Sequence, residues 1–287
     1  MSILVATDLD RTLIYSRSAM GEHQFNTVAP QCVEIYDGAP LSYMSARAIG
    51  LLTRLASTAT VVPVTTRTHA QFSRVTLPGA PLRYAVVSSG GRIIVDGADD
   101  AGWRSGIEDA VRGLDADLRT VTTQLRERTD DGWVRSLRVA DDLFCYMVVD
   151  LERQPAGFLD EWRGWCEPRG WAVSQQGRKI YAMPQCVTKS AAVAEVRRRL
   201  SDTSELPSDA PLLAAGDGWL DADLLTYADA AIRPRHGELE ALGWHRPHLV
   251  ITEQQGALAG EEILQWFIDQ ANRSDPIERT SAYDPAQ

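Results

Sequence analysis

Apolar residues occur along the chain in six short continuous runs, and amphipathic stretches separate most of them. Continuous runs of this length are typical of strands buried on both faces of a parallel sheet. The runs are "SILVAT" (residues 2–7), "TATVVPVTT" (58–66), "RYAVVSS" (83–89), "APLLAAGD" (210–217), "ADAAI" (228–232) and "HLVIT" (248–252). Helical patterns cover residues 45–57, 188–201 and 221–228. This alternation predicts an α/β fold with a doubly wound, Rossmann-like parallel sheet.

The pattern changes in the middle of the chain. Residues 105–128 predict one long amphipathic helix, and residues 133–140 and 143–151 predict two strands joined at Asp141 and Asp142. A helix over 156–169 and strands over 171–175 and 178–183 repeat that order. We therefore expect an inserted α+β domain with helix-strand-strand twice over, spanning residues 92–185. Residues 1–91 and 186–271 would form the core, and the polar residues 272–287 a flexible tail.

A second departure from plain alternation lies near the N-terminus. Residues 16–43 are longer than a simple connection, and "VEIYDGAPLSY" (residues 33–43) predicts a hairpin that turns at Asp37 and Gly38. Two interpretations stay open, namely a flap beside a functional site and a packing decoration.

Composition narrows the class of protein. Hydrophobic residues make up 44% of the 287 residues, and no apolar run approaches the roughly 18 residues of a membrane span. The first ten residues lack the features of a signal peptide, so we expect a cytoplasmic protein. A net charge of -10 with no basic stripe argues against nucleic acid as a partner. The four cysteines have no metal-site spacing.

Polar residues follow the predicted strands at their carboxyl ends, where ligands bind in open α/β sheets. Asp8 ends the first run and Asp10 follows two residues later, so both side chains can converge on one point. Two carboxylates held together share a proton or bind a cation, and Mg²⁺ prefers such oxygen ligands. On its own the stretch is better explained as a polar turn.

Other strand ends add to this inventory. Asp217 lies between two glycines, where it could complete a metal site with Asp8. Lys189 is one of only two lysines, with Lys179, and it follows the helix-capping candidate Thr188, where an anion is favoured. Acids, a hydroxyl and a lysine at one sheet edge are the inventory for phosphoryl transfer through a carboxylate nucleophile.

These residues resemble the motifs of the haloacid dehalogenase superfamily of phosphatases. "DLDRT" (residues 8–12) matches the first motif, Thr65 the second, Lys189 the third and "GDGWLD" (216–221) the fourth, in the family's order. The insertion between the second and third motifs resembles a type IIB cap. Its short form is closer to the sucrose-phosphate, mannosyl-phosphoglycerate and phosphomannomutase branch than to the longer Cof-like caps.

The resemblance implies a set of catalytic roles. Asp8 would be the nucleophile that becomes an aspartyl phosphate, and Asp10 the general acid and base. Thr65 and Lys189 would hold the phosphoryl oxygens. The cofactor Mg²⁺ would be held by Asp8, the backbone carbonyl of Asp10, Asp217 and Asp221.

Substrate contacts are less constrained by the motifs. Arg67, Ser89, Gly90 and the cap residue Arg178 are the candidates, although Arg178 with Lys179 is equally explained as an exposed basic pair. The chain departs from the family pattern at Arg11, where glycine is common, at Thr66, where glycine is also common, and at Leu220, where asparagine is common.

The predicted function is that of a Mg²⁺-dependent phosphatase, a hydrolase acting on a small phosphorylated metabolite, with a sugar phosphate as the expected substrate. A receiver domain is excluded because the whole insertion separates Thr65 from Lys189. A phosphomutase with the same chemistry and a non-catalytic phospholigand-binding module remain as alternatives. The substrate's identity and the oligomeric state are not determined by the sequence.

Overall fold

A parallel sheet of five strands, in the order β14-β13-β12-β1-β4, forms the centre of the core in the computed structural model, which describes residues 3–79 and 82–272. The strands are β1 (Leu4–Thr7), β4 (Thr60–Pro63), β12 (Leu212–Ala215), β13 (Ala230–Arg233) and β14 (Leu249–Ile251). All five were predicted as buried strands, and the doubly wound fold class is confirmed. Because β1 lies between β12 and β4, its carboxyl end is flanked by two other strand ends.

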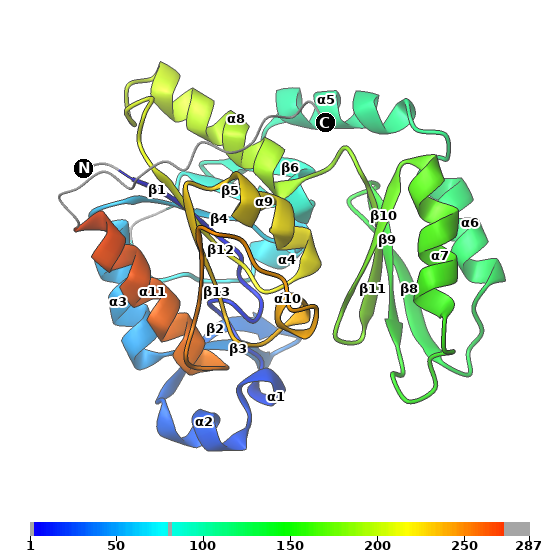
Figure 1. The fold of residues 1–287 in the computed structure, drawn as a ribbon, viewed down its shortest axis with the longest axis horizontal. Helices are drawn as coiled ribbons and strands as arrows, with labels where there is room; N and C mark the ends of the chain where they lie inside the picture. The colour runs from blue at the N-terminus through cyan, green and yellow to red at the C-terminus, as the bar shows by residue number, and fades with distance from the viewer. Residues whose placement is uncertain (1–2, 80–81, 273–287) are drawn as a thin grey trace.

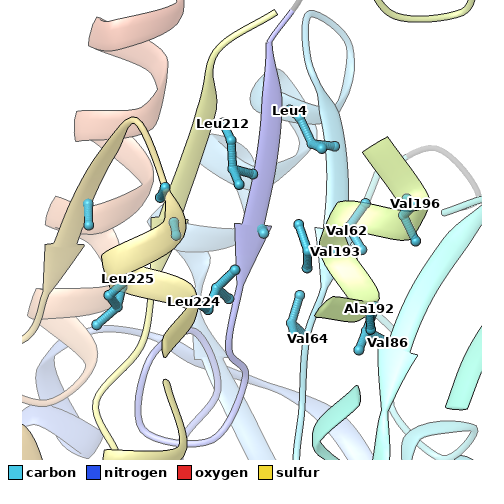
Figure 2. Close-up of a cluster of buried hydrophobic side chains, with 14 of the residues drawn as sticks. Leu4, Val62, Val64, Val86, Ala192, Val193, Val196, Leu212, Leu224 and Leu225 are labelled. Carbon is cyan, nitrogen blue, oxygen red and sulfur yellow. The ribbon is translucent and has the colours of Figure 1, made fainter. Parts of the chain in front are cut away.

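Helices cover both faces of this sheet (Figure 1). One layer contains α3 (Ala46–Ala56) and α11 (Ala257–Ala271), and the other contains α8 (Lys189–Asp202) and α9 (Ala222–Tyr227). Successive residues of each strand alternate between the layers. Val5 packs with the α3 and α11 layer, whereas Leu4 and Ala6 pack with α8 and α9. Figure 2 shows the second cluster, in which Leu4, Val62 and Leu212 meet Val193 and Leu224.

The remaining one of the six predicted strands, β5 (Tyr84–Val87), lies outside the five-stranded sheet. A single parallel bridge, Val64 to Val86, joins it to the main sheet. Its main partner is the antiparallel strand β6 (Arg92–Val95), which also pairs with β7 (Ala98–Asp99). The chain reverses after β5 because Ser88 and Ser89 adopt the left-handed conformation, with φ of 52° and 57°. The predicted boundary at residue 91 therefore falls within this small sheet.

The inserted domain contains a four-stranded antiparallel sheet in the order β10-β11-β9-β8. Its strands are β8 (Val134–Ala140), β9 (Phe144–Val149), β10 (Trp171–Gln176) and β11 (Lys179–Pro184), and its helices α6 (Leu118–Glu127) and α7 (Phe158–Cys166) pack on the outer face (Figure 1). The predicted order of helix-strand-strand, repeated once, is confirmed. We call this domain the cap.

The prediction of a single long helix over residues 105–128 is wrong. Two helices occupy this stretch, α5 (Ala101–Arg112) and α6, and Gly113 follows the last residue of α5. Asp117 starts the second helix, because its side chain accepts a hydrogen bond from the backbone N–H of Thr120 at 2.7 Å. An amphipathic pattern alone does not detect this pair of helix ends.

The segment before α3 forms the predicted hairpin, with β2 (Pro30–Tyr36) paired to β3 (Ala39–Ser45). Asp37 and Gly38 make the turn with φ of 54° and 75°, as a two-residue hairpin turn requires. The remaining elements are short: α1 (Arg17–Met20), α2 (Glu22–Thr27), α4 (His69–Phe72), α10 (Glu238–Ala241) and the 3₁₀ turns η1 (Ser88–Gly90), η2 (Glu167–Arg169) and η3 (Trp219–Asp221). Among the described residues, no helix has the length and apolar character to cross a membrane. Of the predicted tail, residues 273–287 lie outside the described residues.

Candidate active site

Asp8 is the first residue after β1, and its carboxylate is buried at the carboxyl end of the sheet. Its backbone N–H donates to the carbonyl of Ala215 on the neighbouring strand at 2.9 Å, which fixes the main chain. Lys189 Nζ donates to Asp8 Oδ1 at 2.7 Å, and Thr12 Oγ1 donates to Asp8 Oδ2 at 3.3 Å. Two donors therefore orient a carboxylate that points away from the strand end.

Lys189 reaches this point from the start of α8. Thr188 caps the helix as predicted, since its hydroxyl accepts from the N–H of Ala191 at 3.2 Å. The ammonium group also donates to the carbonyl of Val64 at 2.9 Å and to Asp221 Oδ1. Burial alone would lower the pKa of Lys189, but the charges of Asp221 and Asp8 outweigh it and raise the pKa above its usual value. The side chain therefore remains a buried cation.

Three predicted metal ligands, Asp8, Asp217 and Asp221, are brought together by the fold. Their carboxylates offer oxygen atoms that all lie within 4.8 Å of one another, and all three side chains are buried. Asp221 Oδ2 also accepts from the N–H of Gly218 at 2.8 Å. Gly216 is required for this approach, because a Cβ at that position would lie 2.4 Å from the Cβ of Asp221.

Two of these acids, Asp8 and Asp217, have raised pKa values. Burial raises the pKa of Asp8 to about 7, an effect that Lys189 opposes and Asp221 reinforces. Burial also raises the pKa of Asp217 well above its usual value, and the charges of Asp8 and Asp221 act in the same direction. One lysine does not neutralise three carboxylates. Buried, hard oxygen donors with excess negative charge are the donor set that fits Mg²⁺.

Asp10 is not one of the three clustered acids, and its carboxylate forms a two-pronged ion pair with Arg67. Arg67 Nε lies 2.6 Å from Asp10 Oδ2, and the second nitrogen of the fork lies 2.8 Å from Asp10 Oδ1. Burial would raise the pKa of Asp10, but the hydrogen bonds and charge of Arg67 prevail and lower it. The predicted metal ligand at this position is the backbone carbonyl, and that role stays a prediction.

The remaining predicted core residues lie beside these groups. Thr65 follows Val64, the carbonyl partner of Lys189, and its buried hydroxyl accepts from the N–H of Arg67 at 3.2 Å. Ser89 is buried with a left-handed backbone, and within residues 3–79 and 82–272 its hydroxyl has no hydrogen-bond partner. Gly90 has a packing role, because a Cβ there would lie 2.0 Å from the carbonyl oxygen of Thr188. Their contacts with a substrate stay predictions.

Arg11, the first departure from the family pattern, has a structural explanation. Its φ of 63° lies in the left-handed region, which explains why glycine suits this position. Its guanidinium Nε lies 3.4 Å from Asp217 Oδ2, while nearly half of the side chain is exposed. Arg11 thus places a positive charge at the edge of the carboxylate cluster.

The cap presents one face of its sheet to this site. Lys179 and Tyr181 alternate with Ile180 on β11, and Tyr181 pairs with Tyr146 on β9. Burial raises the pKa of Tyr181, as does the charge of Asp10, while a hydrogen bond with Thr66 opposes the shift. Lys179 lowers the pKa of Asp10 through its charge, and its Nζ lies 5.8 Å from the ring centroid of Tyr146. Arg178 is exposed in the turn before β11.

A further contact between cap and core was not predicted. Glu238, at the start of α10, accepts from Ser174 Oγ on β10 at 3.0 Å and from the N–H of Trp219 at 2.8 Å. Its carboxylate therefore joins the cap sheet to the turn that carries Asp217 and Asp221. A lone glutamate in a short helix has no sequence signal for such a role. Tyr146 and Tyr181 were missed for a different reason, since alternation in a strand does not show which face meets the core.

Comparison with known proteins supports the fold. No protein-family model and no curated protein sequence matches this chain. Among solved structures, the sucrose-phosphatase of Synechocystis sp. PCC6803 in complex with sucrose and phosphate is similar, with a TM-score of 0.62 and 15% sequence identity over 93% of this chain and 98% of that one. A Thermoplasma acidophilum protein has a TM-score of 0.55 and 16% identity, over 93% of this chain and 99% of that one. A trehalose-6-phosphate phosphatase related protein has a TM-score of 0.54 and 16% identity, over 93% and 97%.

These likenesses extend over both the core and the cap, since each covers more than nine-tenths of both chains. They confirm the predicted architecture. The chain shares the fold of these structures, a Rossmann-like core with an inserted α+β cap.

Proposed function

We propose that this protein is a Mg²⁺-dependent phosphatase that hydrolyses a small phosphorylated metabolite, with a sugar phosphate as substrate. The observation that carries this proposal is the arrangement around Asp8. Its carboxylate lies 2.7 Å from the buried ammonium of Lys189 and within 4.8 Å of the acids Asp217 and Asp221. A nucleophile, a cation and a metal-binding donor set thus lie at one strand end.

In the first step an oxygen of Asp8 attacks the phosphorus atom of the ester, and the bond from phosphorus to the leaving oxygen breaks. Asp10 has to carry a proton at this point, although its ion pair with Arg67 favours the carboxylate, and it gives that proton to the leaving oxygen, so the product leaves as an alcohol and Asp8 carries the phosphoryl group. In the second step Asp10 takes a proton from water. The water oxygen attacks phosphorus, and phosphate is released with the Asp8 carboxylate restored.

Charge on the transferring phosphoryl group is balanced by fixed positive groups. Lys189 places a buried positive charge next to Asp8, and Thr65 supplies a hydroxyl nearby. Asp8, Asp217 and Asp221 would hold Mg²⁺, with the Asp10 carbonyl as a further ligand. The ion supplies electrostatic stabilisation of the phosphoryl oxygens when bound.

The substrate class rests on two observations. Two similar structures are, by name, a sucrose-phosphatase with sucrose and phosphate bound and a trehalose-6-phosphate phosphatase related protein. The cap sheet also turns Tyr146, Tyr181 and Lys179 toward the site, and aromatic rings with polar tips and an ammonium group suit a polyhydroxylated leaving group.

Phosphate release from a broad panel of phosphate esters with Mg²⁺ tests the proposal, with Asp8→Asn measured beside the wild type. We expect release by the wild type only, and preference for sugar phosphates. Equal release by both proteins would remove Asp8 as the nucleophile. Isomerisation of a sugar phosphate with little release would favour a phosphomutase, and binding without turnover a phospholigand-binding module.

A further inference from the structure

The β2–β3 hairpin places a buried carboxylate, Glu34, behind the active site. Glu34 lies at an irregularity in the pairing of β2 with β3, where the register shifts on both sides of it. Such a bulge redirects a side chain. Val33 and Glu34 are consecutive in the strand and yet both are buried, which regular alternation does not allow. The bulge therefore turns an acid inward that a regular strand would expose.

Three side chains form ion pairs or hydrogen bonds with the Glu34 carboxylate. Its Oε1 lies 2.9 Å from a terminal nitrogen of Arg67 and 3.2 Å from Arg74 Nε, while Oε2 accepts from Ser42 Oγ at 2.6 Å. Its side chain has no exposed surface, so these partners take the place of water around the carboxylate. Ser42, from the second strand of the hairpin, lies 3.3 Å from Arg67 as well.

Arg67 connects Glu34 to Asp10. Its Nε and one terminal nitrogen fork onto the Asp10 carboxylate, and the other terminal nitrogen meets Glu34. Each guanidinium nitrogen thus has a carboxylate partner, and only about a tenth of the side chain is exposed. A planar fork fixed on one side by Glu34 leaves the carboxylate on its other side with little freedom to rotate.

We infer that Glu34 is a positioning residue, which acts through Arg67 to hold the Asp10 carboxylate where it can exchange a proton with the leaving oxygen. On this inference the hairpin is a working part of the active site and not a packing decoration alone. Arg67 acts on the substrate through Asp10 in this account. The inference rests on the proposed function, because it takes Asp10 as the general acid.

The experiment compares kcat/KM for two substrates, an alkyl phosphate and p-nitrophenyl phosphate, in the wild type, Glu34→Gln and Asp10→Asn. An alkyl alcohol needs a proton to leave, whereas p-nitrophenolate leaves without one. Loss of a well-placed acid should therefore lower kcat/KM mainly for the alkyl ester. We expect a loss of about 10- to 100-fold for that ester in Glu34→Gln, with p-nitrophenyl phosphate changed about threefold or less.

A matched control is Glu261 on α11, whose carboxylate bonds to the end of the same hairpin. Glu261 accepts from Ser45 Oγ, at the end of β3, at 2.6 Å and pairs with Arg47 at 3.6 Å, but neither partner contacts Arg67 or Asp10 in the hydrogen bonds and ion pairs of the described residues. Glu261→Gln thus removes the same charge from a similar pair of partners. We expect its two kcat/KM values to stay in the wild-type ratio.

The outcomes distinguish failure of the Glu34 inference from failure of the proposed function. If Asp10→Asn shows the leaving-group dependence and folded Glu34→Gln shows none, the inference is overturned and the proposed function stands. If Asp10→Asn loses both substrates equally, the general-acid assignment itself is wrong and the inference falls with it. Should Glu34→Gln fail to fold, Ser42→Ala carries the test, since it removes one hydroxyl from both Glu34 and Arg67. A preserved substrate ratio in Ser42→Ala would then overturn the inference.

Discussion

The strand ends of the core and the facing surface of the cap carry different kinds of side chain. In the core, Asp8, Lys189 and Asp221 come from distant segments and are buried against one another, with Lys189 bonded to both acids. On the cap, Lys179 and Tyr181 come from one strand and lie across from that cluster. In the proposed function, the core cluster acts on the phosphate ester itself, whereas the cap surface contacts the rest of the substrate.

This difference predicts which substitutions should affect the rate of the reaction and which should affect substrate binding. If the proposed function is correct, groups in the core cluster contact the reacting atoms, and their loss should lower kcat. Cap groups would contact the part of the substrate that does not react, and their loss should raise KM. The following four changes test this division.

The largest effect is expected from Asp8→Asn. An amide oxygen does not replace a carboxylate as nucleophile, so phosphate release with Mg²⁺ should fall to the background of the assay. Asp160→Asn, on an exposed cap residue paired with Arg163, is the matched control and should keep wild-type turnover. Residual Asp8→Asn activity within tenfold of wild type would contradict the core's role.

The next largest effect is expected from Lys189→Met. Removal of the ammonium takes a charged donor from the phosphoryl oxygens, which should lower kcat by about 10² to 10³. It also leaves Asp8 and Asp221 without their buried cation, which should lower the free energy of unfolding by about 3–5 kcal/mol. Kinetics and urea unfolding measure the two effects. A raised KM with unchanged kcat would place Lys189 on the binding side of the comparison.

Binding of Mg²⁺ should depend on pH through the core acids. The pKa of Asp8 is raised to about 7, so a proton occupies this ligand at lower pH and the cation must displace it. Affinity should therefore be about 30-fold weaker at about pH 5.5 than at about pH 8 through Asp8 alone, and weaker still through Asp217. The Mg²⁺-induced rise in Tm of the metal-free protein, measured at both pH values, checks this. An equal rise at both would mean that the acids do not hold the ion.

The smallest effect is expected on the cap. Lys179→Ala should raise KM for a sugar phosphate by about tenfold with kcat little changed, since its ammonium lies on the cap sheet next to Tyr146, where it can contact the part of the substrate that does not react. Arg178→Ala should have a smaller effect because Arg178 lies in the turn before β11, whereas the charge of Lys179 reaches the site at Asp10. Steady-state kinetics of both variants show whether Lys179 or Arg178, the residue predicted from the sequence, contributes more to substrate binding.

The core could be predicted from the sequence because parallel strands impose a common direction. Each buried apolar run ends on the same edge of the sheet, so Asp8, Thr65 and Asp217 could be placed near one another without coordinates. The hairpin turn at Asp37 and Gly38 was also predictable, since few residues adopt its backbone conformation.

The cap and the hairpin network could not be predicted in the same way. Which face of an antiparallel sheet meets the core depends on how the two domains pack, and a shift of one residue exchanges Arg178 for Lys179. Glu34 was missed because a bulge, invisible in the apolar pattern, turns it inward. The break at Gly113 was missed because an amphipathic period continues across it.

The central claim is that Asp8 takes the phosphoryl group, and trapping that group tests it most directly. Asp10→Asn should form the phosphoenzyme from labelled p-nitrophenyl phosphate and release it slowly, because the attacking water lacks its base. Acid quenching and peptide mapping should then find the label on Asp8 in this variant, and none in the double variant Asp8→Asn with Asp10→Asn. Label on another residue, or steady turnover by Asp10→Asn with no labelled protein, would contradict the account.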